Sequence, residues 1–157
     1  DAAFVWDPAL GRIKESGKVL ITSGLLSSWG KATFDGIVAD REWAAENPEF
    51  MVAFVETIAA AGEAYRSNPA AWSPDSPMVK KIVGLIGGNP EDVPKVLSLY
   101  NFLPMEAQIS EQWLGGGAEK ALYYTSQFLL ENKKLPSLLP DYSVTVTDKW
   151  VKMALEQ

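Results

Sequence analysis

The chain has 157 residues, enough for one domain with its own core, and its 47% hydrophobic and 22% charged residues are ordinary for a globular protein. The net charge of −6 comes without a basic cluster, and no apolar stretch has the length of a membrane span, so nucleic-acid binding and membrane insertion are not expected. Cysteine and histidine are absent, which removes disulfides, thiolate nucleophiles, the commonest metal ligand and the commonest general base, and we expect no metal site.

The first eight residues have the pattern of a buried strand that runs into a helix. The apolar run ends at Trp6, Asp7 is suited to cap a helix, and Pro8 is suited to its first position. The short helix that follows is predicted to end at Gly17. Because a strand needs partners and the downstream chain is mostly helical, we expect the partners upstream. The chain is therefore predicted to be the C-terminal part of a larger α/β protein.

Two short apolar segments are predicted to be strands. Residues 18–22 are apolar and β-branched, and residues 33–39 are similar except for Asp35. Residues 23–31 between them contain glycines, serines and Trp29, and they predict a loop. The sequence thus predicts one α/β unit that is mostly helical after two short N-terminal strands.

The rest of the chain is predicted to be helical. Asn47-Pro48-Glu49 combines a cap, a first-position proline and an acidic residue for the helix dipole, which indicates a helix start. The pairs Asn68-Pro69 and Asn89-Pro90 repeat this start signal. Later helices are predicted at residues 78–86, at residues 105–114 before a three-glycine stop, at residues 118–131, and after Thr147-Asp148.

Asp35 is the first candidate for a functional residue. A carboxylate inside an apolar strand is costly to bury unless it has a partner. Strand alternation places Phe34 and Gly36 on the face opposite Asp35, which favours a carboxylate facing solvent on an edge strand. The alternative is a carboxylate at a cleft, where it accepts a cationic group of a ligand.

Trp6 and Trp29 are the next candidates. Each lies at the end of a predicted strand or in the loop beside one, where open α/β sheets bind ligands. An indole offers a flat wall and one N–H donor. A single tryptophan at such a position is more often a core residue. Two tryptophans and an aspartate near strand ends within thirty residues favour a ligand-binding cleft. Asp7, which is first of all a helix cap, and Phe34 complete the predicted set of ligand-binding residues.

Six blocks of sequence together carry a family resemblance. They are residues 4–9, 15–20, 28–30, 33–35, 47–49 and 142–149. In order and spacing they resemble the solute-binding proteins of ABC importers in the sulfonate, nitrate and taurine group, over the whole chain and about half of such a protein. The resemblance implies a periplasmic-binding-protein-like (type II) two-lobe fold. Residues 1–22 would end the second lobe, residues 23–33 would form the hinge crossover, and residues 34–157 would be the C-terminal part of the first lobe.

The resemblance also implies a function. Such a periplasmic protein would bind taurine or a similar amino-sulfonate between its lobes and deliver it to an ABC transporter permease, its only connection to the membrane. It would be a binding protein and not an enzyme, and it would need no cofactor. Asp35 would match the carboxylate that accepts the taurine ammonium, and Trp6 and Trp29 would match the aromatic positions of the cleft. The sulfonate contacts would lie mostly outside this chain. Gly36 departs from members with a bulky residue at that position.

Three alternatives stay open at this point. A binding protein for alkanesulfonates or another small anion fits the same blocks, although Asp35 argues against it. An enzyme that resembles thiamine-pyrimidine-precursor synthases would share the fold, but those that draw substrate atoms from a protein histidine need a residue that this chain lacks. The chain by itself as an interaction module is the third alternative.

Overall fold

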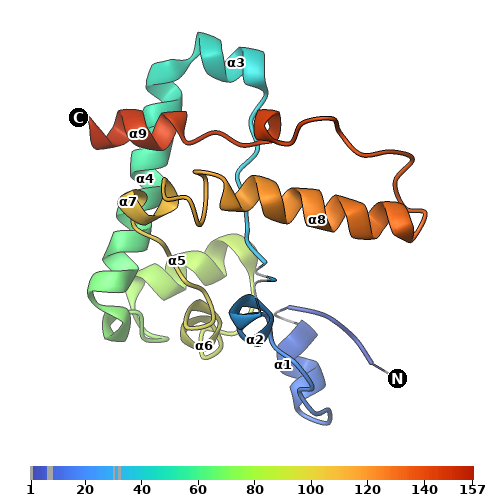
Figure 1. Cartoon of the computed structure of the whole chain (residues 1–157). Coiled ribbons are helices and arrows are strands. Elements are labelled where there is room, and N and C mark those ends of the chain that lie inside the picture. The colour runs from blue at the N-terminus through green and yellow to red at the C-terminus, as the bar shows by residue number, and fades with distance from the viewer. Residues whose placement is uncertain (1, 7–8, 30, 32) are drawn as a thin grey trace.

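The computed structural model describes residues 2–6, 9–29, 31 and 33–157, and all regular elements among them are helices (Figure 1). The α-helices are α1 (Ala9–Lys14), α2 (Ser23–Ser28), α3 (Arg41–Glu46), α4 (Pro48–Ser67), α5 (Pro77–Ile86), α6 (Val93–Leu97), α7 (Met105–Gln108), α8 (Gly117–Glu131) and α9 (Lys149–Leu155). Two 3-10 helices, η1 (Pro69–Ala71) and η2 (Ser143–Thr145), lie in the connections. No described helix is long and apolar enough to cross a membrane.

The core lies around the crossing of α4 and α9, the most extensive contact between two described helices (Figure 1). Helix α9 also contacts α7, and α3 precedes α4 with only Asn47 between them. The buried apolar side chains are few and small: Ala44, Met51, Val52, Val79, Ala118, Val151 and Ala154. All of them follow residue 40, so the folded core belongs to the later three quarters of the chain.

Helix α4 confirms the start signal at Asn47-Pro48-Glu49. Pro48 is the first helical residue and Glu49 is the acid of the first turn. The Asn47 side chain does not cap α4; its amide donates to the Trp43 carbonyl at 2.8 Å and so closes α3. The other two Asn-Pro pairs do not begin α-helices as predicted. Pro69 begins only the short 3-10 helix η1, and a turn separates Pro90 from α6.

The start of α8 depends on glycine. A Cβ on Gly117 would lie 1.7 Å from the Gln112 carbonyl oxygen, and Gly116 has φ +141°, a backbone conformation that disfavours side chains. The three-glycine segment was predicted to stop a helix spanning 105–114. That helix is shorter than predicted, since α7 ends at Gln108 and turns follow. Gly117 then forms the first residue of α8.

The predicted α/β class, with its two-lobe architecture and two N-terminal strands, is wrong for the part of the chain that the structure describes. Residues 18–21 and 33–39 are irregular, and no backbone hydrogen bond joins either segment to another described residue. A strand exists only as one member of a hydrogen-bonded ladder, and no partner segment is in place. Figure 1 shows residues 33–40 as a long connection that ends at α3. The predicted division into residues 1–22, 23–33 and 34–157 is untested and stays a prediction.

The predicted loop at residues 23–31 is also wrong, because it contains α2. Thr22 has extended backbone, and its Oγ1 accepts a hydrogen bond from the Leu25 N–H at 3.1 Å, which is N-capping geometry. Glycine and serine in the segment favoured a loop, and the cap at Thr22 outweighed them.

Replacing Ser76 with alanine is expected to destabilise the chain by about 0.5–2 kcal/mol. The Ser76 hydroxyl caps α5 by accepting the N–H of Val79 at 3.3 Å, and Val79 is the most deeply buried large residue described. Urea unfolding followed by circular dichroism measures the loss. Ser76→Thr keeps the acceptor and is the control, so equal losses from both variants would contradict a capping role.

Candidate functional site

The structure places Asp35 at the surface of an irregular segment. Its side chain is exposed, and no described residue donates a hydrogen bond to it or forms an ion pair with it. The enclosing cleft expected around the carboxylate is therefore not built by the described residues of this chain. The arrangement leaves the carboxylate available to a ligand cation or to groups from another segment.

The predicted aromatic residues are also at the surface. Trp6 is 74% exposed and Trp29 is 61% exposed, so neither is the core tryptophan that a single indole would most often be. The Trp6 carbonyl accepts the Leu10 N–H at the start of α1, and the Trp29 N–H donates to the Leu26 carbonyl at the end of α2. Phe34 is 40% exposed, and Asp7 lies outside the described residues.

The predicted site residues do not come together in contact. Within the described ranges, neither indole makes a ring contact with the other or with Phe34, and no hydrogen bond links these side chains to Asp35. Trp6, Trp29, Phe34 and Asp35 are all exposed, and all of them precede residue 40. Their convergence on one ligand stays a prediction.

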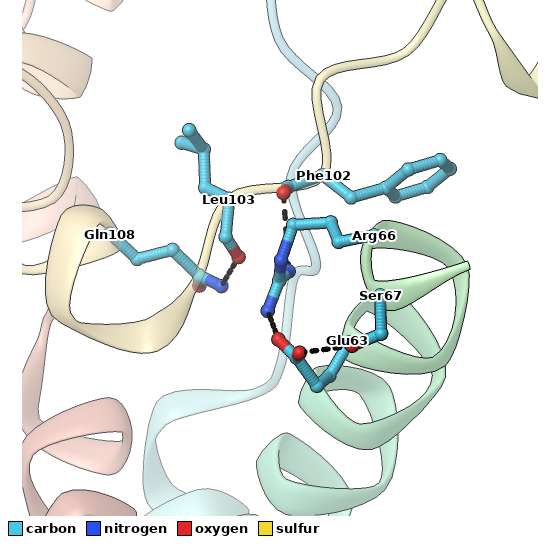
Figure 2. A network of polar contacts seen from close by, with 6 residues as sticks. All are labelled: Glu63, Arg66, Ser67, Phe102, Leu103 and Gln108. Carbon is cyan, nitrogen blue, oxygen red and sulfur yellow. Dashed lines mark hydrogen bonds and ion pairs between the residues drawn. The ribbon is translucent and has the colours of Figure 1, made fainter. Parts of the chain in front are cut away.

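A polar network fixes the connection between α6 and α7 to helix α4 (Figure 2). Figure 2 shows the Arg66 guanidinium between two partners: it donates to the Phe102 carbonyl at 3.1 Å and pairs with the Glu63 carboxylate. The Ser67 hydroxyl donates to the other Glu63 oxygen. Gln108 donates to the Leu103 carbonyl at 3.0 Å, which holds the same loop to α7. The network orders backbone and has no free reactive group, so its role is structural.

Glu63→Gln is expected to reduce stability at neutral pH and to have a diminishing effect in acid. The Ser67 hydroxyl and the Arg66 guanidinium hold the pKa of the Glu63 carboxyl below its ordinary value of 4.5. A lowered pKa in the folded state stabilises the fold above the unfolded-state pKa and loses this effect as pH falls through the folded-state value. Urea midpoints of the two proteins should therefore converge below about pH 4.5.

The exposed acid of α8 offers a control, because Glu131→Gln removes a carboxylate from a helix without touching this network. A difference between wild type and Glu63→Gln that stays constant from neutral pH to strong acid would contradict the stabilising role of the Glu63 carboxylate.

A separate hollow of about 240 Å³ lies between α8 and the loop before η2. Tyr123 is central to it, because its ring centroid lies 5.6 Å from those of both Tyr124 and Tyr142. The hollow is lined by Glu119, Lys120, Tyr123, Tyr124, Leu139, Pro140, Asp141, Tyr142 and Ser143. None of the predicted site residues is among them.

The charges around this hollow are set by local contacts. The Ser143 hydroxyl and backbone N–H both donate to the Asp141 carboxylate at 2.8 Å, and they lower the pKa of that carboxyl. The Lys31 ammonium lies 5.3 Å from the centroid of the Tyr124 ring. Sequence reasoning did not select these tyrosines. Two signals were available: Tyr123 and Tyr124 are adjacent on a predicted helix, and Tyr142 belongs to one of the six blocks that carry the resemblance. Aromatic faces beside carboxylates can hold a cation, and here a lysine of the chain already occupies one ring face.

The chain is similar in sequence to a known protein. No family model matches the sequence. The chain is similar to the "Taurine-binding periplasmic protein" of Escherichia coli (strain K12). The two sequences are 34% identical over 152 residues, which cover 97% of this chain and 47% of the relative. The chain thus spans about half the length of the curated relative it matches. The match confirms the resemblance read from the six blocks.

Proposed function

We propose that this chain is part of a periplasmic solute-binding protein that takes taurine or a similar amino-sulfonate and presents it to an ABC transporter permease. The supporting observation is the 34% identity to the E. coli taurine-binding protein along nearly the whole chain. The role is binding and not catalysis, which agrees with a sequence that has neither histidine nor cysteine.

Within this proposal Asp35 accepts the ammonium group of the ligand. Taurine carries a cationic amine and an anionic sulfonate, so its recognition needs an acceptor for the amine. Asp35 is a carboxylate that has no ion-pair partner among the described residues. A desolvated hydrogen bond between an ammonium and a carboxylate contributes about 1.5–3 kcal/mol.

Trp6, Trp29 and Phe34 supply flat walls for the carbon chain of the ligand, and an indole N–H can donate to a sulfonate oxygen. The exposure of both indoles supports this role, because neither is needed in the core of the chain. Asp7 adjoins Trp6 in the sequence and stays in the proposed set. Groups outside this chain supply most of the sulfonate contacts.

Calorimetric titration of the intact protein that contains this sequence tests the function. We expect one taurine to bind per protein, and ethanesulfonate, which has the sulfonate without the amine, to bind more weakly by at least tenfold. β-Alanine keeps the amine and replaces the sulfonate with a carboxylate, so it probes the other end of the ligand. Absence of taurine binding would overturn the proposed function, and equal affinities for taurine and ethanesulfonate would assign the protein to alkanesulfonates.

A further inference from the structure

Three tyrosine rings line the hollow between α8 and the loop before η2. The ring of Tyr123 is inclined by 60° to the ring of Tyr124 and by 77° to the ring of Tyr142. Neither pair is stacked face to face, so the rings do not cover one another's faces in the way that parallel rings do. The volume of about 240 Å³ suits a small molecule better than a peptide.

The charged groups of the hollow are mainly acidic. Among the described lining residues, Asp141 and Glu119 contribute two carboxylates and Lys120 contributes an ammonium. The Ser143 hydroxyl and N–H hold the pKa of the Asp141 carboxyl below its ordinary value, so this group is ionised at neutral pH. The Glu119 carboxylate has no hydrogen bond or ion pair with another described residue. The hollow therefore combines aromatic faces with negative charge, and both attract an organic cation.

One ammonium group already lies on this aromatic cluster. The Lys31 Nζ is 5.3 Å from the centroid of the Tyr124 ring, within the range of a cation–π contact. Lys31 forms no ion pair with a described carboxylate, so the ring is its partner in this part of the chain. Lys31 is not among the described residues that line the hollow. Its contact supports cation binding by these rings and leaves those of Tyr123 and Tyr142 to a ligand.

We propose that this hollow binds a small alkylated ammonium ion, with the cationic group against the rings of Tyr123 and Tyr142 and beside the Asp141 carboxylate. Alkyl groups spread the positive charge over an apolar surface, so such an ion loses less hydration than a primary ammonium and covers more of an aromatic face. None of the described residues proposed for the taurine site lines this hollow. The inference is therefore a second site, and it does not rest on the proposed function.

Aromatic NMR of the intact protein that contains this sequence, prepared with isotope-labelled tyrosine, tests the proposal. Choline is the cationic probe, and neohexyl alcohol, which has carbon in place of the nitrogen, is its neutral isostere. We expect choline to shift the ring signals of Tyr123 and Tyr142 saturably, and the alcohol to bind about threefold more weakly or worse. The rings of Tyr65 and Tyr100, which contact Phe102, are internal references. No saturable shift with choline, or equal binding of the alcohol, would overturn the proposal.

Substitutions separate the contributions of charge and ring. Asp141→Asn removes the charge and still accepts the Ser143 N–H, and Tyr123→Leu keeps apolar bulk without an aromatic face. Each should weaken choline binding about threefold or more. Tyr123→Phe keeps the ring and should bind choline as the wild type does, and Asp75→Asn removes a carboxylate that does not line the hollow. Equal weakening by Asp141→Asn and Asp75→Asn, or unchanged affinity in Tyr123→Leu, would overturn the assignment.

Taurine separates this site from the one in the proposed function. Saturating taurine should leave the choline-induced shifts of Tyr123 and Tyr142 unchanged, because the two ligands occupy different residues. Displacement of choline by taurine would place both ligands in one site and overturn the proposal. The choline titration itself needs no taurine, so failure of the taurine titration leaves its result intact.

Discussion

Replacing Asp35 with asparagine is expected to weaken taurine binding to the intact protein about ten- to hundredfold. Asparagine keeps the size of the side chain but loses the charge, so the ligand ammonium loses a charge-assisted hydrogen bond that contributes about 1.5–3 kcal/mol. Ethanesulfonate has no amine and should bind no worse to the variant. Its affinity should instead rise, because the wild-type site would desolvate an unpaired carboxylate when this ligand binds. Calorimetry with both ligands and both proteins gives the full comparison.

Asp40→Asn is a matched control for this experiment. Asp40 lies five residues along the same segment, and its carboxylate caps α3 by accepting the Trp43 N–H at 2.8 Å. Asparagine caps a helix about as well as aspartate, so this variant changes the same charge without loss of structure. An equal loss of taurine affinity in the two variants would mean that general charge, and not a contact from Asp35, accounts for the effect. Unchanged taurine affinity in Asp35→Asn would remove this residue from the site.

The helices that were correctly predicted have their signals within a few residues of their ends. Asn47 precedes α4 and Pro48 is its first residue, Gly87 with φ +76° ends α5, and Asn132 lies at the C-terminal end of α8. Capping, a first-position proline and a glycine stop act through neighbouring backbone groups, so the sequence contains all of the relevant physics. The prediction for residues 105–114 failed, because α7 ends at Gln108 and turns follow it before the glycines.

The two predicted strands failed because a strand is a non-local element. Residues 18–22 and 33–39 have the apolar, β-branched composition of strands, and this composition is a response to burial among neighbours. The described chain offers no segment to pair with them, so they stay irregular and exposed. Sequence composition thus identified the segments that have the apolar character of buried strands, but it did not show whether a partner strand was present.

The candidate site was predictable only as a set of residue types. An isolated carboxylate in an apolar segment and two indoles near segment ends indicate ligand chemistry, and their role as ligand-binding residues stays a prediction. Their convergence is a tertiary property, and the described residues before residue 41 have no core to impose it. The tyrosines around Tyr123 show the opposite case, where structure gathers side chains from α8 and a distant loop that sequence reasoning did not connect.

Met51→Ala is expected to lower the free energy of unfolding of the chain by about 2–5 kcal/mol. Met51 is 7% exposed on α4, and α4 and α9 both contribute buried apolar residues to the contact that dominates the core. Removing its side chain forfeits burial and leaves a cavity that neighbours fill only in part. With so few buried residues, little other packing can compensate. For a chain of this length the melting temperature should fall by roughly 2–4 °C per kcal/mol.

Leu85→Ala on α5 provides the comparison, because it also shortens an apolar side chain within a helix but at a position that is 77% exposed. Surface substitutions of this kind change stability by about 0.5 kcal/mol or less. Urea unfolding of the two variants should therefore differ by at least about 1.5 kcal/mol. Equal losses would place Leu85 in a buried environment in solution and would contradict a core centred on α4 and α9. A loss confined to Met51→Ala would support a core centred on the crossing of α4 and α9.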